Sequence, residues 1–410
     1  MAESALEAPD TTAFASEGRA RFAATVVVGH ALKHLLTSGL SSVLMPEIKI
    51  GLSLTATQVG SLGSVQQFSG WFATMAAGYL GDRFTKKTGL MLGLSLGITG
   101  SSLFLLGVSR SYLMLLIAML FMGFGPSMFH PPAVGALSRR FADRRAFAIS
   151  LHGTGGSIGE VLGPLTAAGL LALLYWRDVL KLTFVPAIVG AFLICALLKN
   201  SATRQENGPT TFRQYLGSFA ALLKQRALVL ILLVTAFRSV GQATTSIFLP
   251  IYLREDLAYS SGLVGLYISV SQLAGIGSQP LMGFLSDRFG HKQVIIPALI
   301  GFAMLLGLVP LAEGKLPLAL VILALGVFLF SMQSILTSAA VDLAGHEVHS
   351  TVVSLIYASS FVGSLAPTFA GVLADVYGLK STFYFSCSLA AVAAVILALT
   401  KLPGRAEPEL

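Results

Sequence analysis

The chain has 410 residues, of which 54% are hydrophobic and only 11% are charged. Soluble globular domains carry about 25% charged residues, so this composition excludes a soluble protein whose surface is mostly exposed to water. The net charge of +8 does not indicate a nucleic-acid partner, because most Lys and Arg residues lie in the polar segments that the positive-inside rule places on the cytoplasmic side of a membrane.

Twelve apolar stretches are long enough to cross the roughly 30 Å hydrocarbon layer of a membrane as helices. We therefore predict an all-α membrane protein whose transmembrane helices span residues 22–45, 57–80, 88–107, 112–138, 146–172, 178–198, 227–252, 261–285, 292–312, 316–342, 349–374 and 381–401. Residues 1–21 are predicted to form an N-terminal tail, 22–198 a first bundle of six helices, 199–226 a polar linker, 227–401 a second bundle and 402–410 a C-terminal tail. The distribution of Lys and Arg predicts a multi-pass protein of the plasma (inner) membrane with both termini in the cytoplasm.

The loops that follow the second and the eighth predicted helices carry the same motif. Residues 78–87 read GYLGDRFTKK, and residues 283–292 read GFLSDRFGHK. Two halves in parallel repeat, with a solute site between them near the membrane midplane, are a known plan of transporters. The repeat therefore predicts two pseudo-symmetric six-helix bundles that move against each other.

These loops resemble the signature of the major facilitator superfamily. Within that superfamily the chain is similar to the fosmidomycin-resistance type of efflux protein, through the short motifs Gly29-His30, Phe129-His130-Pro131, Gly155-Gly156, Gly163-Pro164, Phe237-Arg238-Ser239 and Phe248-Leu249-Pro250. The resemblance implies the major facilitator fold, an antiporter function in drug resistance, and a helix-packing motif at Gly159, Gly163 and Pro164. It also implies that the loop residues gate the cytoplasmic side, namely Gly78, Asp82, Arg83, Lys86, Gly283, Asp287, Arg288 and Lys292.

Several ionisable residues are predicted to lie inside the membrane. A charge at the bilayer centre costs at least about 2.5–3.5 kcal/mol, so such residues face a partner or a watery passage. Lys33 lies about 16 Å into the first span, near the midplane, and the offset between the two loops pairs it with Arg238 and pairs Gln67 with Gln272. Two cations at equivalent depths favour an anionic solute. The alternatives are that Glu160 neutralises one cation or that Lys33 is deprotonated.

Histidines accompany these charges. His30 and His34 share one helix face with Lys33, and His130 could approach them from span four. They could bind the solute, relay protons, or pack as neutral side chains. A metal ion is a further alternative, but the neighbouring ammonium would repel it and no carboxylate or thiolate completes the shell, so we expect no metal site. The predicted solute-binding set is Lys33, Arg238, His30, His34, His130, Gln67, Gln272 and Gln242.

Span five carries the candidate proton carrier. His152, Gly156, Glu160 and Pro164 repeat every four residues and thus line one face of that helix. We expect Glu160, with His130 and His152, to couple transport to protons. The alternative is that a protonated Glu160 makes a hydrogen bond to a neighbouring helix.

Together these features predict a secondary active transporter that works by alternating access and exports a small organic anion or an amphiphilic drug in exchange for protons. One alternative is a proton-symport importer of a carboxylate or phosphonate, and a remote one is a non-transporting membrane receptor or assembly factor. The sequence contains no GxxxxGKS/T nucleotide-binding motif and no catalytic constellation. We expect no enzyme activity, no cofactor and no nucleic-acid partner, and we expect a monomer surrounded by membrane lipid.

Overall fold

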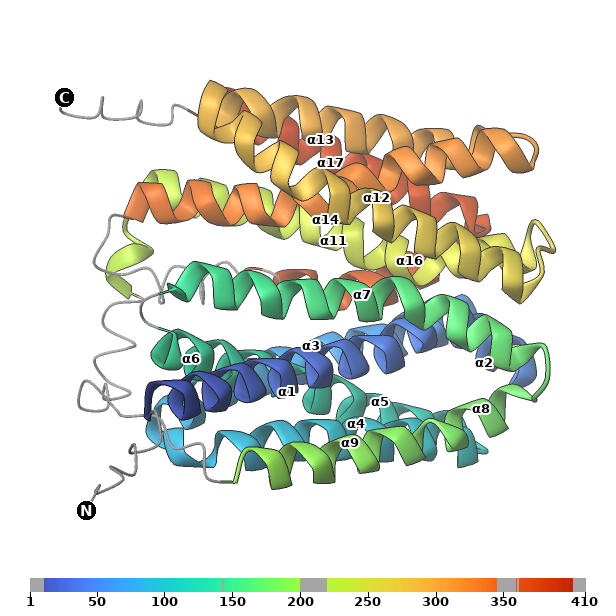
Figure 1. Cartoon of the computed structure of the whole chain (residues 1–410). Coiled ribbons are helices and arrows are strands. Elements are labelled where there is room, and N and C mark those ends of the chain that lie inside the picture. The colour runs from blue at the N-terminus through green and yellow to red at the C-terminus, as the bar shows by residue number, and fades with distance from the viewer. Residues whose placement is uncertain (1–10, 142–143, 200–219, 345–358, 360, 401–410) are drawn as a thin grey trace, which may run out of the picture.

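The computed structural model describes residues 11–141, 144–199, 220–344, 359 and 361–400, and the described chain folds into helices joined by short turns (Figure 1). The first half comprises α1 (Thr11–Gly39), the π-helical segment η1 (Leu40–Leu44), α2 (Met45–Gly51), α3 (Ala56–Arg83), the 3-10 turn η2 (Thr85–Lys87), α4 (Thr88–Val108), α5 (Tyr112–Ser127), α6 (His130–Arg140), α7 (Arg145–Leu171), α8 (Trp176–Leu182) and α9 (Phe184–Leu197). The second half comprises α11 (Arg226–Glu255), α12 (Ser261–Phe289), α13 (His291–Leu308), η4 (Val309–Leu311), α14 (Lys315–Ala344), η6 (Val362–Leu365), α16 (Ala366–Tyr377) and α17 (Lys380–Leu399).

Each predicted span overlaps one described helix or consecutive helices, although α1 begins at Thr11, inside the predicted tail 1–21. The first part of the predicted span 349–374 lies outside the described residues. Seven of the described helical segments are long and apolar enough to cross a membrane. The segments α1, α3, α7 and α12 are equally long but more polar, because they lie where protein packs on protein. The predicted all-α membrane fold with two six-helix halves is confirmed.

Proline residues divide the predicted span 112–138 into two helices. The span 112–138 consists of α5 and α6, separated at Met128 and Phe129. Pro131 and Pro132 follow this break, and proline both lacks a backbone N–H and disfavours a helical residue before it. The break makes His130 the first residue of α6 and brings a new helix start into the middle of the first half.

Helices α1 and α7 pack at backbone distance. A Cβ atom built on Gly159 would lie 2.1 Å from the carbonyl oxygen of Ala31, and one on Gly163 would lie 2.6 Å from that of Leu35. Small residues at such positions let transmembrane helices approach closely. Pro164 follows inside α7, so the predicted packing motif lies in the contact between α1 and α7.

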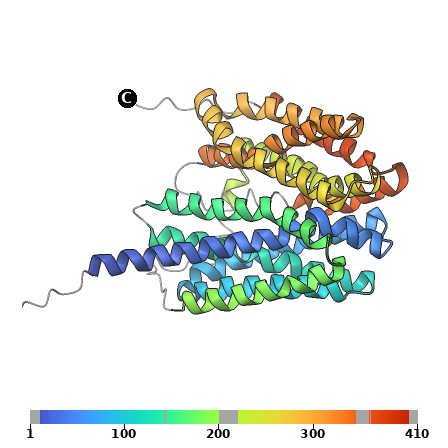
Figure 2. The same cartoon turned by 45° about the vertical axis from the view of Figure 1, so that its right-hand side comes forward.

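The two halves lie one above the other in Figure 1, with α1–α9 below and α11–α17 above, and the turned view in Figure 2 shows the same division. Helix α7 packs on α12, and α3 packs on α16. We call one end of the bundle, which holds α2 and the turn between α11 and α12, the far end. We call the opposite end, where α1 begins and α17 ends, the termini end (Figure 1).

Two ion pairs join the halves at the far end. The Nζ atom of Lys49 lies 2.7 Å from Oε2 of Glu255, and Nε of Arg254 lies 2.6 Å from Oε1 of Glu47. The hydroxyl of Ser261 also donates to the Glu47 carboxylate, at 2.8 Å. We call Glu47, Lys49, Arg254 and Glu255 the far-end clasp, since each pair spans the boundary between the halves.

Asp375 strengthens the same boundary by capping a helix of the opposite half. Its carboxylate accepts hydrogen bonds from the backbone N–H groups of Ala56 and Thr57 at 2.8 Å each, and from the Thr57 hydroxyl at 2.6 Å. These N–H groups belong to the first turn of α3, where a helix has no internal partner for them and where its dipole favours an anion. Burial opposes ionisation, but these hydrogen bonds hold the pKa of the Asp375 carboxyl below its ordinary value.

Candidate functional site

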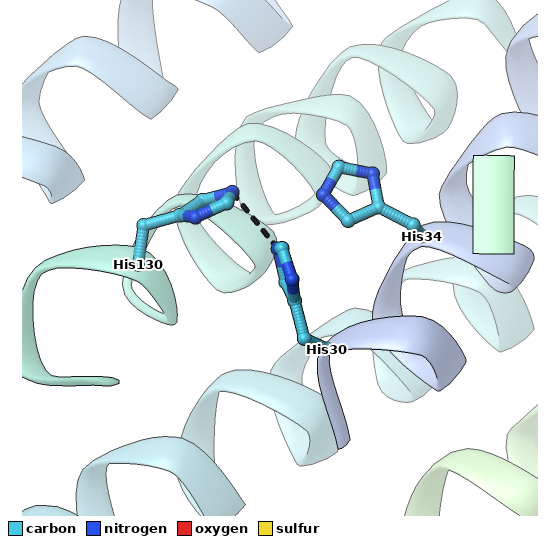
Figure 3. Close-up of side chains that lie close together, drawn as sticks. All are labelled: His30, His34 and His130. Atoms are coloured by element: carbon cyan, nitrogen blue, oxygen red, sulfur yellow. Dashed lines mark hydrogen bonds between the residues drawn. The ribbon is translucent and has the colours of Figure 1, made fainter. Parts of the chain in front are cut away.

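Helices α1, α6 and α7 bring six ionisable side chains together inside the first half. The set, called here the histidine cluster, consists of His30, Lys33, His34, His130, His152 and Glu160. The 3.6-residue helical period places His30, Lys33 and His34 on one side of α1. Figure 3 shows the rings of His30, His34 and His130 turned toward one another.

Lys33 is directed at a histidine and not at a carboxylate. Its Nζ atom lies 2.8 Å from Nε2 of His130, and the residue is only 3% exposed. An ammonium has donors only, so it donates to the lone pair of His130 Nε2. The proton on His130 then lies on Nδ1.

His30 is oriented by the backbone of α7. Its Nδ1 lies 2.7 Å from the carbonyl oxygen of His152, so Nδ1 carries the proton and donates it. The other nitrogen, Nε2, lies 3.4 Å from Nε2 of His130. The His152 ring stacks on His30, with centroids 3.8 Å apart, and neither of its ring nitrogens has a hydrogen-bond partner among the described residues.

His34 and Glu160 form the more accessible edge of the cluster. Nδ1 of His34 lies 3.1 Å from Oε1 of Glu160, and the two side chains are 18% and 34% exposed. The backbone carbonyl of Glu160 accepts a hydrogen bond from Ser38, which holds this part of α7 against α1. Glu160 therefore lies at the exposed edge of the cluster, while its partner His34 reaches into the buried part.

Arg238 lies in the second half, on α11, and is fully buried. It donates from Nη1 to Oε1 of Gln333 at 3.0 Å and from Nη2 to the carbonyl oxygen of Leu329, both on α14. Its Nε atom and the Nε2 atom of Gln333 have no hydrogen-bond partner within the described part of the chain. Among the described residues, the guanidinium thus donates hydrogen bonds to neutral acceptors and pairs with no carboxylate.

The contacts of Lys33 and of Arg238 each remain within one half. The convergence of these two cations on one solute therefore stays a prediction. Gln333 was missed by sequence reasoning, and the repeat offers no signal for it because the offset that relates the halves places Met128 at the equivalent position.

The glutamines that the sequence places near the solute are distributed over three helices. Gln272 of α12 donates to the Ser38 hydroxyl of α1 at 3.2 Å and so joins the two halves. Gln67 is half-buried on α3, and Gln242 is half-buried on α11, one turn after Arg238.

The predicted gating residues lie at the termini end. Gly78, Asp82 and Arg83 end α3, and Lys86 lies in η2, but the side chain of Asp82 is outside the described part of the structure. Arg83 donates to the Tyr79 hydroxyl at 2.9 Å.

The equivalent residues of the second half, Gly283, Asp287 and Arg288, end α12. Lys292 is the second residue of α13 and donates to the carbonyls of Ala398 and Thr400 at 2.9 and 2.6 Å, where the C-terminus of α17 favours a cation. The recorded contacts of Arg83 and Lys292 thus lie within their own halves.

Comparison with known proteins identifies the family. The profile of the Major Facilitator Superfamily matches residues 31–364 and 231–409. The fosmidomycin resistance protein of Escherichia coli (strain K12) is 25% identical over 318 residues, which cover 76% of this chain and 77% of that protein. The multidrug resistance protein MdtG of Escherichia coli (strain 55989) is 30% identical over 311 residues, which cover 70% of this chain and 72% of MdtG.

Solved structures agree in fold. A variant of the nucleoside transporter NupG superposes with a TM-score of 0.77 at 15% identity. The superposition covers 93% of this chain and 100% of the NupG chain. A bacterial homologue of the human lysosomal transporter Spinster, in an inward-facing and occupied conformation, gives a TM-score of 0.72 at 16% identity and covers 93% of this chain and 96% of its own.

Proposed function

Since this chain belongs to the major facilitator superfamily of transporters, we propose that it exports a small organic anion or an anionic amphiphilic compound across the inner membrane in exchange for protons. Two of its relatives are named for resistance to fosmidomycin and to multiple drugs, which favours export over import. Alternating access of the two halves is the mechanism that a parallel repeat of helices serves.

The burial of the Arg238 guanidinium is the main observation in favour of an anionic solute. Removing a charge from water costs several kcal/mol unless a partner of opposite charge compensates it. The partners of Arg238 are an amide and a backbone carbonyl. A solute carboxylate or phosphonate that reached Arg238 would supply an opposite charge. The Nε atom, which has no hydrogen-bond partner among the described residues, is a donor available to it.

Glu160 is the proposed proton carrier. Its contact with His34 joins a solvent-accessible carboxylate to the buried chain His34, His130 and Lys33. A proton that arrives on Glu160 removes its charge and weakens the hold on His34, which would change the field that Lys33 experiences. His130 and His152 are proposed to complete the relay.

We propose that the termini end faces the cytoplasm and the far end faces the opposite side. In this orientation the far-end clasp closes the outer side of the transporter. When the far end opens, the Asp-Arg loops close the cytoplasmic side instead. We further propose that the protein acts as a monomer, because each chain supplies both halves of the solute site.

Flux measurements with reconstituted protein test the anion proposal. Lys33→Ala and Arg238→Gln are each expected to lower the uptake of a panel of radiolabelled organic anions into proteoliposomes to the level of protein-free liposomes. Arg226→Gln is the matched control, because Arg226 lies exposed at the start of the same helix as Arg238, and it should transport like the wild type. Unchanged anion flux in both Lys33→Ala and Arg238→Gln would eliminate the anion site.

A further inference from the structure

Three imidazole nitrogens of the histidine cluster converge on one point. Suitable ring nitrogens of His30, His34 and His130 all lie within 4.8 Å of one another (Figure 3). Nε2 of His30 and Nε2 of His130 are 3.4 Å apart. Two histidine ligands of a tetrahedral zinc ion, each at about 2.0–2.1 Å from the metal, stand roughly 3.3–3.4 Å apart, so this spacing is that of a ligand pair.

The hydrogen bonds around the cluster leave these nitrogens unprotonated. His30 donates from Nδ1 to the carbonyl oxygen of His152, so its Nε2 presents a lone pair. His34 places Nδ1 against the Glu160 carboxylate at 3.1 Å, so its Nε2 likewise presents a lone pair. Metal-binding histidines are held in this way, with the second ring nitrogen donating to a backbone carbonyl or a carboxylate.

We propose that His30, His34 and His130 form a binding site for one divalent first-row transition metal ion, with Glu160 as the residue that positions His34. Three neutral imidazoles suit zinc, cobalt and nickel ions and leave one tetrahedral position for water or for a solute group. The sequence led us to expect no metal site, because the neighbouring ammonium would repel the ion and no carboxylate or thiolate was found to complete the shell. The structure adds a third ligand from α6 and a carboxylate from α7.

Lys33 and the metal ion are alternative occupants of the site. The ammonium donates to the same His130 lone pair that a metal ion would use, at 2.8 Å. Binding of the metal therefore requires the Lys33 side chain to withdraw from His130. This competition leads to a specific prediction. Removing the amine of Lys33 should strengthen metal binding, whereas removing one of the imidazoles should weaken it.

Metal titration of the purified full-length protein in detergent, after removal of any affinity tag and of adventitious metal with a chelator, tests the site. The probes are Zn²⁺ alone, measured by calorimetry, and Co²⁺ alone, whose absorption spectrum reports tetrahedral nitrogen ligands. One ion per chain is expected to bind the wild type. His130→Ala should abolish binding, Glu160→Gln should weaken it by about 10- to 100-fold, and Lys33→Met should tighten it.

His291→Ala is the matched control, because His291 lies at the start of α13, outside the cluster, and should leave the stoichiometry and affinity unchanged. Thermal unfolding of every variant checks that it is folded, and His34→Gln, a milder change, replaces His130→Ala if the latter fails this check. Absence of binding to the wild type, or equal affinity in the histidine variant and the wild type, would overturn the proposal. The assay involves no transport, so its failure leaves the proposed export function untouched.

Discussion

Glu160 contributes a carboxylate to a cluster whose other members are imidazoles and an ammonium. The side chain is 34% exposed and contacts His34, so it lies at the exposed edge of the cluster. Buried or membrane-embedded acids of this kind serve as proton carriers in transporters.

We expect Glu160→Gln to abolish transport driven by a pH gradient, because the amide cannot take up and release a proton. Exchange of solute across liposomes without a pH gradient should persist. Glu313→Gln, which alters an exposed acid in the turn before α14, serves as the control. Full pH-driven uptake by Glu160→Gln in inverted vesicles would remove Glu160 from the coupling mechanism.

The burial of individual charged residues could be predicted, but their partners could not. Hydropathy identifies Lys33 and Arg238 as charges inside the membrane, since each interrupts an apolar span. The orientation of a long side chain depends on what packs around it. Lys33 turns to His130 and Arg238 turns to Gln333, and neither choice follows from the spacing along one helix.

Helix packing between α1 and α7 depends on glycine at the points of contact. Gly159→Ala would place a methyl group 2.1 Å from the carbonyl oxygen of Ala31, so the helices must separate. Overpacking of this kind costs about 1–3 kcal/mol. We expect a clear fall in the thermal unfolding temperature in detergent.

Gly153→Ala provides the control on the same helix. A Cβ atom at Gly153 meets nothing within 4 Å, and alanine favours a helix by about 0.8–1.0 kcal/mol over glycine. This variant should unfold at the same temperature as the wild type or at a higher one. Equal losses of stability in both variants would show that the glycines act through helix propensity and not through the contact.

The cap that Asp375 makes on α3 gives the far end a dependence on pH. The folded pKa of the carboxyl lies below its ordinary value of 3.8, so the contact stabilises the folded protein at pH values above that point and is lost as the pH falls through the folded value. Asp375→Asn should therefore lower the unfolding temperature at neutral pH.

The difference in unfolding temperature between the wild type and Asp375→Asn should narrow as the solution becomes more acidic. Asp178→Asn, which changes an aspartate paired with Lys181 on the surface, is expected to have little effect at any pH. A difference between wild type and Asp375→Asn that stays constant with pH would contradict the capping role.

At the level of elements, the spans could be predicted well because apolar length and helix formation coincide in a membrane. The helix α14, Lys315–Ala344, covers the predicted span 316–342 almost residue for residue. The helix breaks within the spans were harder to predict, because hydropathy does not report a change of backbone direction inside an apolar stretch. The division of span 112–138 at Met128 follows from Pro131 and Pro132, which the sequence contains but which hydropathy ignores.

At the scale of the whole molecule, the two halves are joined at the far end by charges from both. Lys49 and Glu47 come from the first half, while Glu255 and Arg254 come from the second. An interface that must open during transport suits ion pairs, because exposed or partly exposed pairs contribute only about 0–1 kcal/mol each. The far-end clasp can thus hold the two halves together at the far end without preventing them from separating there.

The division into two halves was predictable because the repeat of the Asp-Arg loop is visible in the sequence. The clasp was not, because its members are charged residues at helix ends, where the sequence alone indicates solvation. Only the packing of α2 against α11 brings these charges together.

Reversible locking of the far end tests alternating access directly. In a chain with Cys195→Ser and Cys387→Ser, the substitutions Lys49→Cys and Glu255→Cys place one thiol on each half, at positions whose native side chains meet at 2.7 Å. A short bifunctional thiosulfonate reagent would link them, and a reducing agent would release them. Each single-cysteine protein, treated in the same way, serves as the control.

The linked protein is expected to stop transporting its solute and to recover after reduction, because the far end must open once in every cycle. Transport by the linked protein at the rate of the reduced protein would contradict an exporter whose halves move against each other.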